Sequence, residues 1–235
     1  MQNCQWVLLL LGDSALPTGG FVASSGLEAY ASVFKPSKRD LVAFVEDNVL
    51  AYAAAALPYL SQAHSVIADC TEQQMTTIAE LDDSFESLLA SNVPARRASK
   101  AQGSALVSLI DRAFPDSDPV FLAIARRFRI RIREGTTQGH HPLLFSLLCA
   151  TLRVPLPATQ ELFLFCHARA LVSAAVRLNL WGPYEGQREM LSLQPVVARV
   201  LKRVRARMVE AVQTGVMVEL VQGLHDRLYS RLFNS

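Results

Sequence analysis

The chain has 235 residues, of which 51% are hydrophobic and 19% are charged. This composition excludes a disordered or collagen-like chain, and the length is enough to bury a sizeable core. Mean hydropathy is +0.22, but no run of about 18 apolar residues free of charge is present, so we expect no membrane-spanning helix. A globular chain of this composition is expected to expose apolar side chains on its surface. Large exposed apolar patches usually mark places where other proteins bind.

Charge is distributed unevenly along the chain. Residues 1–100 hold 6 basic against 11 acidic residues, a net charge of −5, whereas residues 101–235 hold 17 against 10, a net charge of +7. The total of +2 conceals this difference. Because complementary charge guides the choice of partner, we expect acidic and basic surfaces that meet different proteins.

The cysteines and the first residues indicate the compartment. Cys4, Cys70, Cys149 and Cys166 form no CxxC pair and lie among apolar or helix-forming neighbours. This pattern is typical of buried free thiols in a reducing compartment. Residues 1–11 lack the positive start and the small-residue cleavage site of a signal peptide. We therefore expect a cytoplasmic protein.

Hydrophobic residues recur at helical spacing almost throughout, and several predicted helices begin with a proline at the first turn. Residues 126–133 alternate apolar and basic side chains, but a lone strand has no partner, so we expect the end of a helix there. The pattern predicts an all-α, single-domain bundle of about ten helices over residues 1–235. After an N-terminal helix at about residues 1–12, the predicted ranges are 37–56, 58–69, 71–89, 94–114, 119–131, 142–152, 157–180, 184–191 and 195–213.

Turn-forming residues are densest between Asp13 and Phe21, ahead of a short helix that contains Glu28. Gly19 and Gly20 permit close backbone approach, and the N-terminus of the next helix could receive an anion, so a phosphate site is one interpretation. The loop has no lysine and no GKS or GKT motif. The alternative is a rigid connector in which Asp13 or Ser14 caps backbone amides.

A second cluster of turn residues spans 135–142 and contains the adjacent pair His140 and His141. Neutral imidazole binds nickel, zinc or copper, which suggests a metal site. Adjacent helical residues diverge, however, and no acidic or cysteine partner follows at ligand spacing. The alternative is a histidine that bonds a backbone carbonyl and sets the turn.

Basic residues gather between Arg199 and Arg207, which suggests binding of nucleic acid or of an anionic membrane. Val200, Leu201 and Val204 interleave with them as on an amphipathic helix, and aromatic residues for base stacking are missing nearby. A solvated helix face is the favoured interpretation. No G-x-S-x-G motif or other catalytic arrangement is found along the chain, so we expect no enzyme activity.

The C-terminal tail, residues 225–235, is unusually rich in apolar and aromatic residues for a chain end. Tyr229, Leu232 and Phe233 stand beside Arg227 and Arg231, and aromatic and arginine residues dominate interface hot spots. Either the tail packs on its own domain or it becomes ordered on a partner. We expect the second.

Four segments, taken together and in their order along the chain, resemble the urease accessory protein UreF family, and the resemblance covers essentially all of the chain. They are the loop and following helix start (residues 13–28), the Gly-His turn (139–142), a late helix with the turn that follows it (173–187), and the C-terminal tail (225–235). The residues that carry the resemblance, and the partner-binding residues that it implies, are Asp13, Ser14, Pro17, Gly19, Gly20, Phe21, Ser25, Gly26, Glu28, Gly139, His140, Pro142, Arg177, Gly182, Gln187, His225, Arg227, Tyr229, Arg231, Leu232, Phe233 and Ser235.

The resemblance implies an all-α, non-catalytic homodimer that stands between the UreD/UreH scaffold and the GTPase UreG while nickel is delivered to apo-urease. Nickel, GTP and magnesium would belong to the partners, with no cofactor bound by this chain. Residues of about 1–12 and 225–235 would engage UreD/UreH. Two other functions compete with this one: a helical metal- or phosphate-binding enzyme that uses His140, His141 and Asp13, and a nucleic-acid-binding helical protein.

Overall fold

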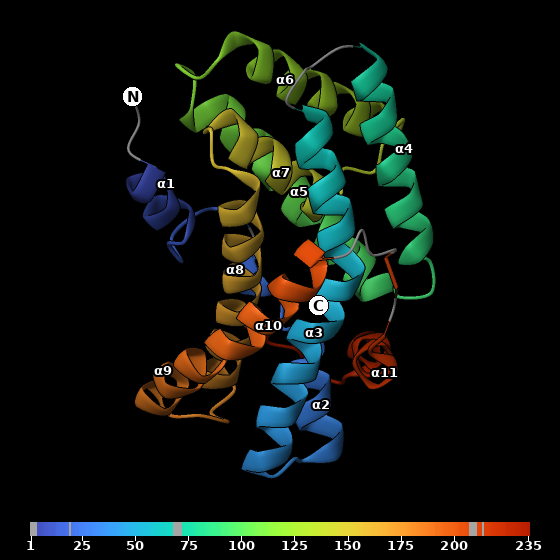
Figure 1. The fold of residues 1–235 in the computed structure, drawn as a ribbon. Helices are drawn as coiled ribbons and strands as arrows, with labels where there is room; N and C mark the ends of the chain where they lie inside the picture. The colour runs from blue at the N-terminus through green and yellow to red at the C-terminus, as the bar shows by residue number, and fades with distance from the viewer. Residues whose placement is uncertain (1–3, 19, 68–71, 207–210, 213) are drawn as a thin grey trace.

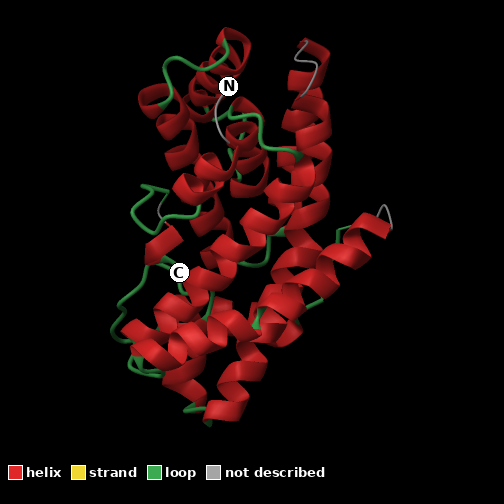
Figure 2. Ribbon diagram, turned by 60° about the vertical axis from the view of Figure 1, so that its left-hand side comes forward, coloured by secondary structure: helices red, strands yellow, loops and turns green. Residues whose placement is uncertain are grey.

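A computed structural model describes residues 4–18, 20–67, 72–206, 211–212 and 214–235, and the account below concerns these residues. Within them the structure consists of helices and loops without a strand (Figure 2), which confirms the all-α prediction. The helices are α1 (Cys4–Leu11), η1 (Gly20–Val22), α2 (Leu27–Phe34), α3 (Lys38–Ile67), α4 (Glu72–Leu88), α5 (Val93–Ala113), α6 (Pro119–Glu134), α7 (His141–Thr151), α8 (Leu156–Arg177), α9 (Pro183–Ser192), α10 (Gln194–Ala206), α11 (Val216–Leu224) and η2 (His225–Arg227).

The long helix α3 runs through the middle of the molecule, and α7 and α8 pack against it (Figure 1). Helices α4, α5 and α6 gather around α7 at one end, whereas α2, α9 and α11 lie at the other. Because α3 and α8 reach both ends, they join the two halves of the bundle.

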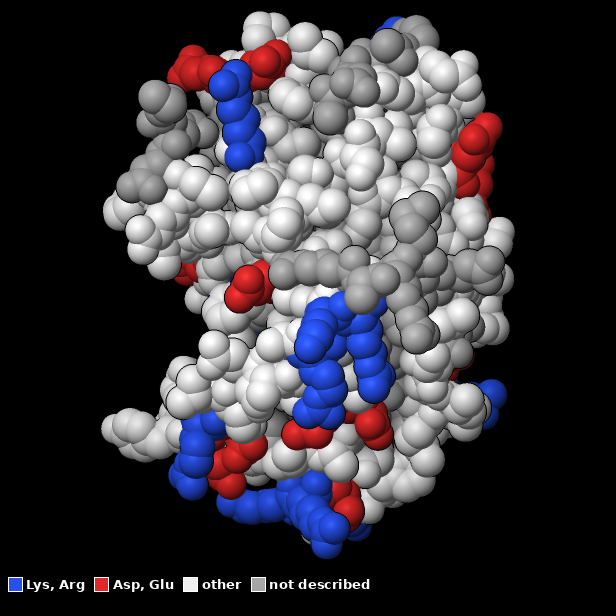
Figure 3. All heavy atoms as spheres, viewed as in Figure 1, with Lys and Arg blue, Asp and Glu red and all other residues white. Residues whose placement is uncertain are grey.

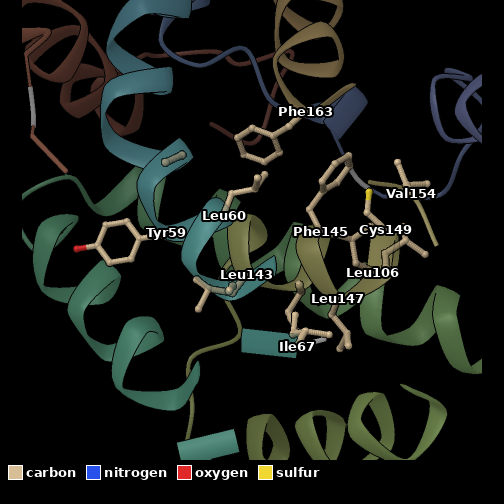
Figure 4. Close-up of a cluster of buried hydrophobic side chains, with 14 of the residues drawn as sticks. Tyr59, Leu60, Ile67, Leu106, Leu143, Phe145, Leu147, Cys149, Val154 and Phe163 are labelled. Atoms are coloured by element: carbon tan, nitrogen blue, oxygen red, sulfur yellow. The ribbon is translucent and has the colours of Figure 1, made fainter. Parts of the chain in front are cut away.

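Buried hydrophobic side chains form two clusters that match these two ends. The larger cluster includes Leu60, Phe145 and Phe163, which point toward one another from three different helices (Figure 4). The smaller one joins α2, the start of α3, the end of α8 and α11, and it includes Phe233 of the tail. Each large apolar side chain buried in this way contributes roughly 1.5–3 kcal/mol to stability.

Helix α3 is continuous through Pro58, so the prediction of two helices separated at this residue is wrong. Proline lacks the amide hydrogen that would bond the carbonyl four residues earlier, which here belongs to Ala54. The amide of Val212 donates to that carbonyl instead, at 3.4 Å. The helix therefore tolerates Pro58 because a segment distant in sequence supplies the missing donor.

Other boundaries follow the sequence prediction more closely, and residues 126–133 lie in α6 as expected. Helix α10 ends at Ala206, and residues 211–212 are not helical, so the predicted helix over 195–213 is too long. Part of that predicted end lies outside the described residues. Helix α11 is absent from the prediction, because its nine residues are shorter than the stretch over which helical spacing is recognised in a sequence.

Among the described residues, α3 is the one helix long and apolar enough to cross a membrane by length and composition. Half of its most apolar stretch is buried inside the bundle, as in the core helix of a globular protein. Cys149 is also buried, but Cys4 is exposed, so the expectation of buried thiols fails there. Burial raises the pKa of the Cys149 thiol to about 12 and that of the half-buried Cys166 to about 11.

Helix α5 passes very close to the turn that leads into α7. A Cβ atom built on Gly103 of α5 would lie 1.9 Å from the carbonyl oxygen of Gly139 and 3.1 Å from the carbonyl carbon of His140. Gly139 itself has a φ of +74°, in the left-handed region that favours glycine. Only a residue without a side chain at position 103 lets the two backbones pack at this distance.

We therefore expect Gly103→Ala to lower the free energy of unfolding by roughly 3 kcal/mol, because the new methyl group meets backbone that has no room to move. Denaturant unfolding measures the change. The matched control is Gly223→Ala on α11, where nothing lies within 4 Å of the added Cβ. That control should gain roughly 0.5–1 kcal/mol from helix propensity. Equal stability of the two variants would contradict the proposed close contact.

Candidate functional site: the Gly-His turn, the loop and the tail

The turn at residues 137–140 is organised around one carboxylate, that of Asp82 on α4. Its Oδ2 accepts hydrogen bonds from the Thr137 hydroxyl and from the amides of Gln138 and Gly139, each at 2.7 Å. Its Oδ1 accepts from the amide of His140 at 2.8 Å. Asp82 is only 1% exposed. These four hydrogen bonds compensate the buried carboxylate for the loss of water. They also fix the path of the chain into α7.

Sequence reasoning missed Asp82, although a signal is present. Met75, Ile78 and Phe85 form the apolar face of α4, and Asp82 occupies the same face at the same spacing. An acidic residue in such a position must be paired when it is buried. The pattern thus marks a structural carboxylate but does not identify its partners, which lie more than 50 residues away.

His140 is fully buried, and both of its ring nitrogens are engaged. The Glu86 carboxylate only accepts hydrogen bonds, so Nε2 of His140 carries the ring proton and donates it to Glu86 Oε2 at 2.9 Å. Nδ1 then accepts from the Ser99 hydroxyl at 3.1 Å, and the oxygen of that hydroxyl also accepts from the His141 amide. Burial lowers the pKa of His140, although Asp82 and Glu86 act in the opposite direction. The neutral ring serves as a hydrogen-bonded support for the turn.

Glu86 completes this network from the same face of α4. Burial raises its pKa, but hydrogen bonds from Lys100 and His140 outweigh that effect and hold the carboxyl pKa below its ordinary value. Lys100 Nζ donates to Glu86 at 2.9 Å and to the Gln138 side chain at 2.6 Å. The turn is thus bound to α4 and α5 by one continuous set of polar contacts.

His141 points away from His140, into a different environment. Its Nδ1 lies 3.0 Å from the Tyr52 hydroxyl, and its ring packs on Phe163. Burial lowers the pKa of His141 to about 3. The rings of the two adjacent histidines therefore point into different environments and do not converge on one point. Pro142, buried at the first turn of α7, fills the position where a missing amide costs no hydrogen bond.

The N-terminal loop is held in shape by hydrogen bonds within its own segment. Asp13 Oδ1 accepts from the Ala15 amide at 2.9 Å, as expected for a capping role, and Gly20 begins η1. Gly19 lies outside the described residues. Ser25 and Gly26 both have left-handed φ values, of 51° and 89°. The carbonyl of Ser25 accepts side-chain hydrogen bonds from α3 and α11, which fixes the start of α2.

The loop borders a cleft of about 620 Å³ that is also lined by α3, α5, α8, α9 and α11. His141 and His167 both line it. Asn48 donates its amide hydrogen to Ser25, so its oxygen accepts from His167 Nε2 at 3.0 Å. Burial lowers the pKa of His167 to about 3, with a smaller effect of His141 in the same direction. The cleft therefore presents neutral imidazoles and largely apolar walls.

Arg177, near the end of α8, connects the loop to the tail. Its guanidinium lies 4.1 Å from the ring centre of Phe21 and 4.3 Å from that of Phe233, and it donates to the Phe21 carbonyl. Each such cation–π contact contributes about 0.5–1 kcal/mol at an exposed site. Three sequence segments that resemble the family separately thus meet at one side chain in the fold.

The tail packs on its own domain, so the expectation that it becomes ordered on a partner is wrong. Glu28 accepts from the amides of Leu232 and Phe233, at 2.5 and 3.1 Å. The Ser235 carbonyl accepts from the amide and the hydroxyl of Ser24, at 2.6 and 2.8 Å. Phe233 is buried in the smaller hydrophobic cluster. Sequence alone did not place Glu28 opposite the tail, because 204 residues separate it from Leu232.

Some tail side chains nonetheless face outward. Tyr229 is fully exposed and Leu232 is 55% exposed, while Phe21 of the loop is 53% exposed. The Asn234 amide donates to the Val22 carbonyl, so loop and tail run beside each other. We call the exposed apolar residues of these two segments, Phe21, Val22, Tyr229 and Leu232, the loop–tail surface.

The remaining predicted positions take supporting places. Arg231 and Arg97 both pair with Asp226, at 2.9 and 2.8 Å. The Ser14 hydroxyl donates to Asp13 Oδ1 at 3.5 Å. Pro17 and Arg227 are exposed, Gly182 precedes the first residue of α9, and Gln187 lines the cleft.

Charge on the surface is more mixed than its distribution along the chain suggests. Figure 3 shows basic side chains gathered over α10, with acidic ones close by on the same face. Arg199, Lys202 and Arg203 are exposed there, while Val200 and Leu201 are buried, as an amphipathic helix requires. The side chains of residues 205–210 lie outside the described part. On this face the two signs of charge are therefore not separated into two surfaces.

We expect Asp82→Asn to lower the free energy of unfolding by at least about 3 kcal/mol, because one amide oxygen cannot satisfy four buried donors. The matched control is Asp83→Asn, at an exposed neighbour, which should change stability by less than about 0.5 kcal/mol. Denaturant unfolding of both variants measures the difference. A mild effect at Asp82 would show that the turn does not depend on this carboxylate.

Comparison with known proteins identifies the family. A UreF family model matches residues 36–194. The urease accessory protein F of Arabidopsis thaliana is 34% identical over 243 residues, covering all of this chain and 93% of that protein. That of Oryza sativa subsp. japonica is 31% identical, covering 97% of this chain and 83% of the relative. The urease accessory protein UreF of Paenarthrobacter aurescens is 30% identical, with 98% of each chain covered. The chain therefore belongs to the UreF family of urease accessory proteins.

Proposed function

We propose that this chain is a non-catalytic scaffold of urease maturation, which bridges the UreD/UreH scaffold and the GTPase UreG during GTP-dependent nickel insertion into apo-urease. It acts in the cytoplasm as a homodimer, and nickel, GTP and magnesium are handled by its partners. Membership of the family supports this role. The observation that carries it is the loop–tail surface, where apolar side chains are exposed on a backbone held by buried polar contacts.

The geometry suits binding better than catalysis. Asp82 and His140 use their polar atoms in hydrogen bonds that hold the turn. The imidazoles that line the cleft are neutral. Exposed aromatic and aliphatic side chains on a fixed backbone suit an interface, since little conformational freedom is lost when a partner binds. Helix α1 adds Trp6 and Leu9, which are both mostly exposed. We assign α1 and the loop–tail surface to UreD/UreH.

A co-purification experiment tests the assignment of partners. The tagged chain should retain UreD/UreH by itself and should retain UreG only when UreD/UreH is present. Tyr229→Ala should weaken capture of UreD/UreH at least about tenfold, because exposed tyrosines at interfaces are frequent hot spots. The same change at Tyr184, an exposed tyrosine on α9, should leave that capture unchanged. Failure to capture UreD/UreH under any condition would contradict the proposal.

Nickel measurements test the handling of the metal. Urease made in cells that lack this chain should contain much less nickel than urease made with it. The isolated chain, equilibrated with nickel and then desalted, should retain far less than one equivalent by elemental analysis. Tight stoichiometric nickel that disappears on His141→Ala would instead favour the competing function, a helical metal-binding enzyme. His141 is the informative position, because both nitrogens of His140 are already engaged.

A further inference from the structure

His225, the first residue of η2, is fully buried between α2 and the tail. Its Nε2 lies 3.2 Å from the carbonyl oxygen of Phe233. A carbonyl only accepts hydrogen bonds, so Nε2 carries the proton and donates it. Nδ1 is then left with a lone pair, and it is the one buried side-chain nitrogen or oxygen without a hydrogen-bond partner in the described part of the chain.

The group nearest to this nitrogen is already committed to the tail. Glu28 Oε2 lies 3.9 Å from Nδ1, which is beyond hydrogen-bond distance. The same carboxylate accepts the amides of Leu232 and Phe233. The docked tail therefore needs the Glu28 carboxylate placed to accept these two amides. It also needs the His225 ring protonated at Nε2, so that it can donate to the Phe233 carbonyl.

Charged groups around His225 come from several elements, although α11, which also packs on η2, contributes none to the ion pairs there. Glu28 belongs to α2, Asp226 to η2 and Arg231 to the tail, while Arg97 of α5 pairs with Asp226 and Arg177 of α8 lies over Phe233. Burial lowers the pKa of His225, Glu28 and Asp226 act against it, and Arg231 lowers it further. The net pKa lies below the ordinary value, so the docked site favours the neutral ring.

We propose that His225 is a pH-sensitive latch for the C-terminal tail, which holds residues 228–235 on the domain when its ring is neutral and releases them when it is protonated. A second ring proton would place a charge at a fully buried nitrogen that has no acceptor within hydrogen-bond distance. Release would hydrate the ring, expose Phe233 and free the Glu28 carboxylate. This device belongs to the isolated chain and does not depend on the proposed partners.

The direction of the pH dependence follows from the two states of the ring. In the released tail His225 has an ordinary pKa of about 6.5, whereas in the docked tail its pKa is lower. Docking is therefore strongest above about pH 6.5 and weakens as the pH falls through the interval between the two values. Within that interval the docking equilibrium constant falls by up to about tenfold for each unit of pH.

Hydrogen exchange of the full-length chain tests the latch. The amides of Leu232 and Phe233, corrected for intrinsic exchange rates, should lose protection at least about fivefold between pH 7.5 and 5.5. Amides in the middle of α8 should not change. His225→Gln keeps a side-chain donor for the Phe233 carbonyl but does not titrate, so its tail protection should not depend on pH. His64→Gln, at another histidine bonded to a backbone carbonyl, should behave like the wild type.

A direct titration of the ring keeps the proposal testable if His225→Gln fails to dock the tail. By NMR, the His225 ring of the wild type should titrate at lower pH than that of Phe233→Ala, in which the aromatic cover is lost. Its neutral form should be the Nε2–H tautomer. Tail protection that stays constant down to pH 5.5, or an ordinary His225 pKa in the docked wild type, would overturn the latch. Neither measurement involves a partner, so these outcomes are independent of the co-purification results.

Discussion

The fold depends on a buried carboxylate that holds a turn. Asp82 collects four donors from residues 137–140, and this fixes where α7 begins. Helix α7 is surrounded by α3, α5 and α6, so its placement determines how the larger hydrophobic cluster closes. The close passage of Gly103 against Gly139 fits the same requirement, because a side chain there would force α5 away from the turn. The hydrogen bonds of Asp82 and the close packing of α5 thus constrain the same turn, residues 137–140.

The other end of the molecule is held together by contacts between the two ends of the chain. Glu28 and Ser24 near the N-terminus bind the backbone of the tail, and Arg177 lies between Phe21 and Phe233. These contacts use backbone amides and buried rings, so they leave Tyr229 and Leu232 free to face outward. A segment can therefore belong to the domain and still offer a binding surface. Packing of the tail on its own domain thus leaves side chains of the same segment exposed.

The buried histidines of this fold act as hydrogen-bonded supports. His140 and His141, which first suggest a metal site, lie inside the fold as neutral rings bonded to a serine, a glutamate and a tyrosine. His225 is bonded to a carbonyl. Buried neutral imidazoles give rigidity at physiological pH and carry a built-in response to acid. At the Gly-His turn both ring nitrogens are satisfied, whereas at the tail one is not. In the proposed latch, that difference separates a permanent support at the turn from a contact at the tail that pH changes.

The sequence by itself determined the helical class and most helix boundaries, because apolar spacing, prolines and caps are local signals. It also identified the residues at the loop, the turn and the tail, since their order along the chain carries the family resemblance. Only the tertiary structure decided that α3 continues through Pro58, that Asp82 holds the turn and that Glu28 receives the tail. Each of these depends on a donor or acceptor distant in sequence, such as the Val212 amide that satisfies Ala54. A local pattern can show that a buried polar group needs a partner, but only the folded chain determines which group lies within hydrogen-bond distance.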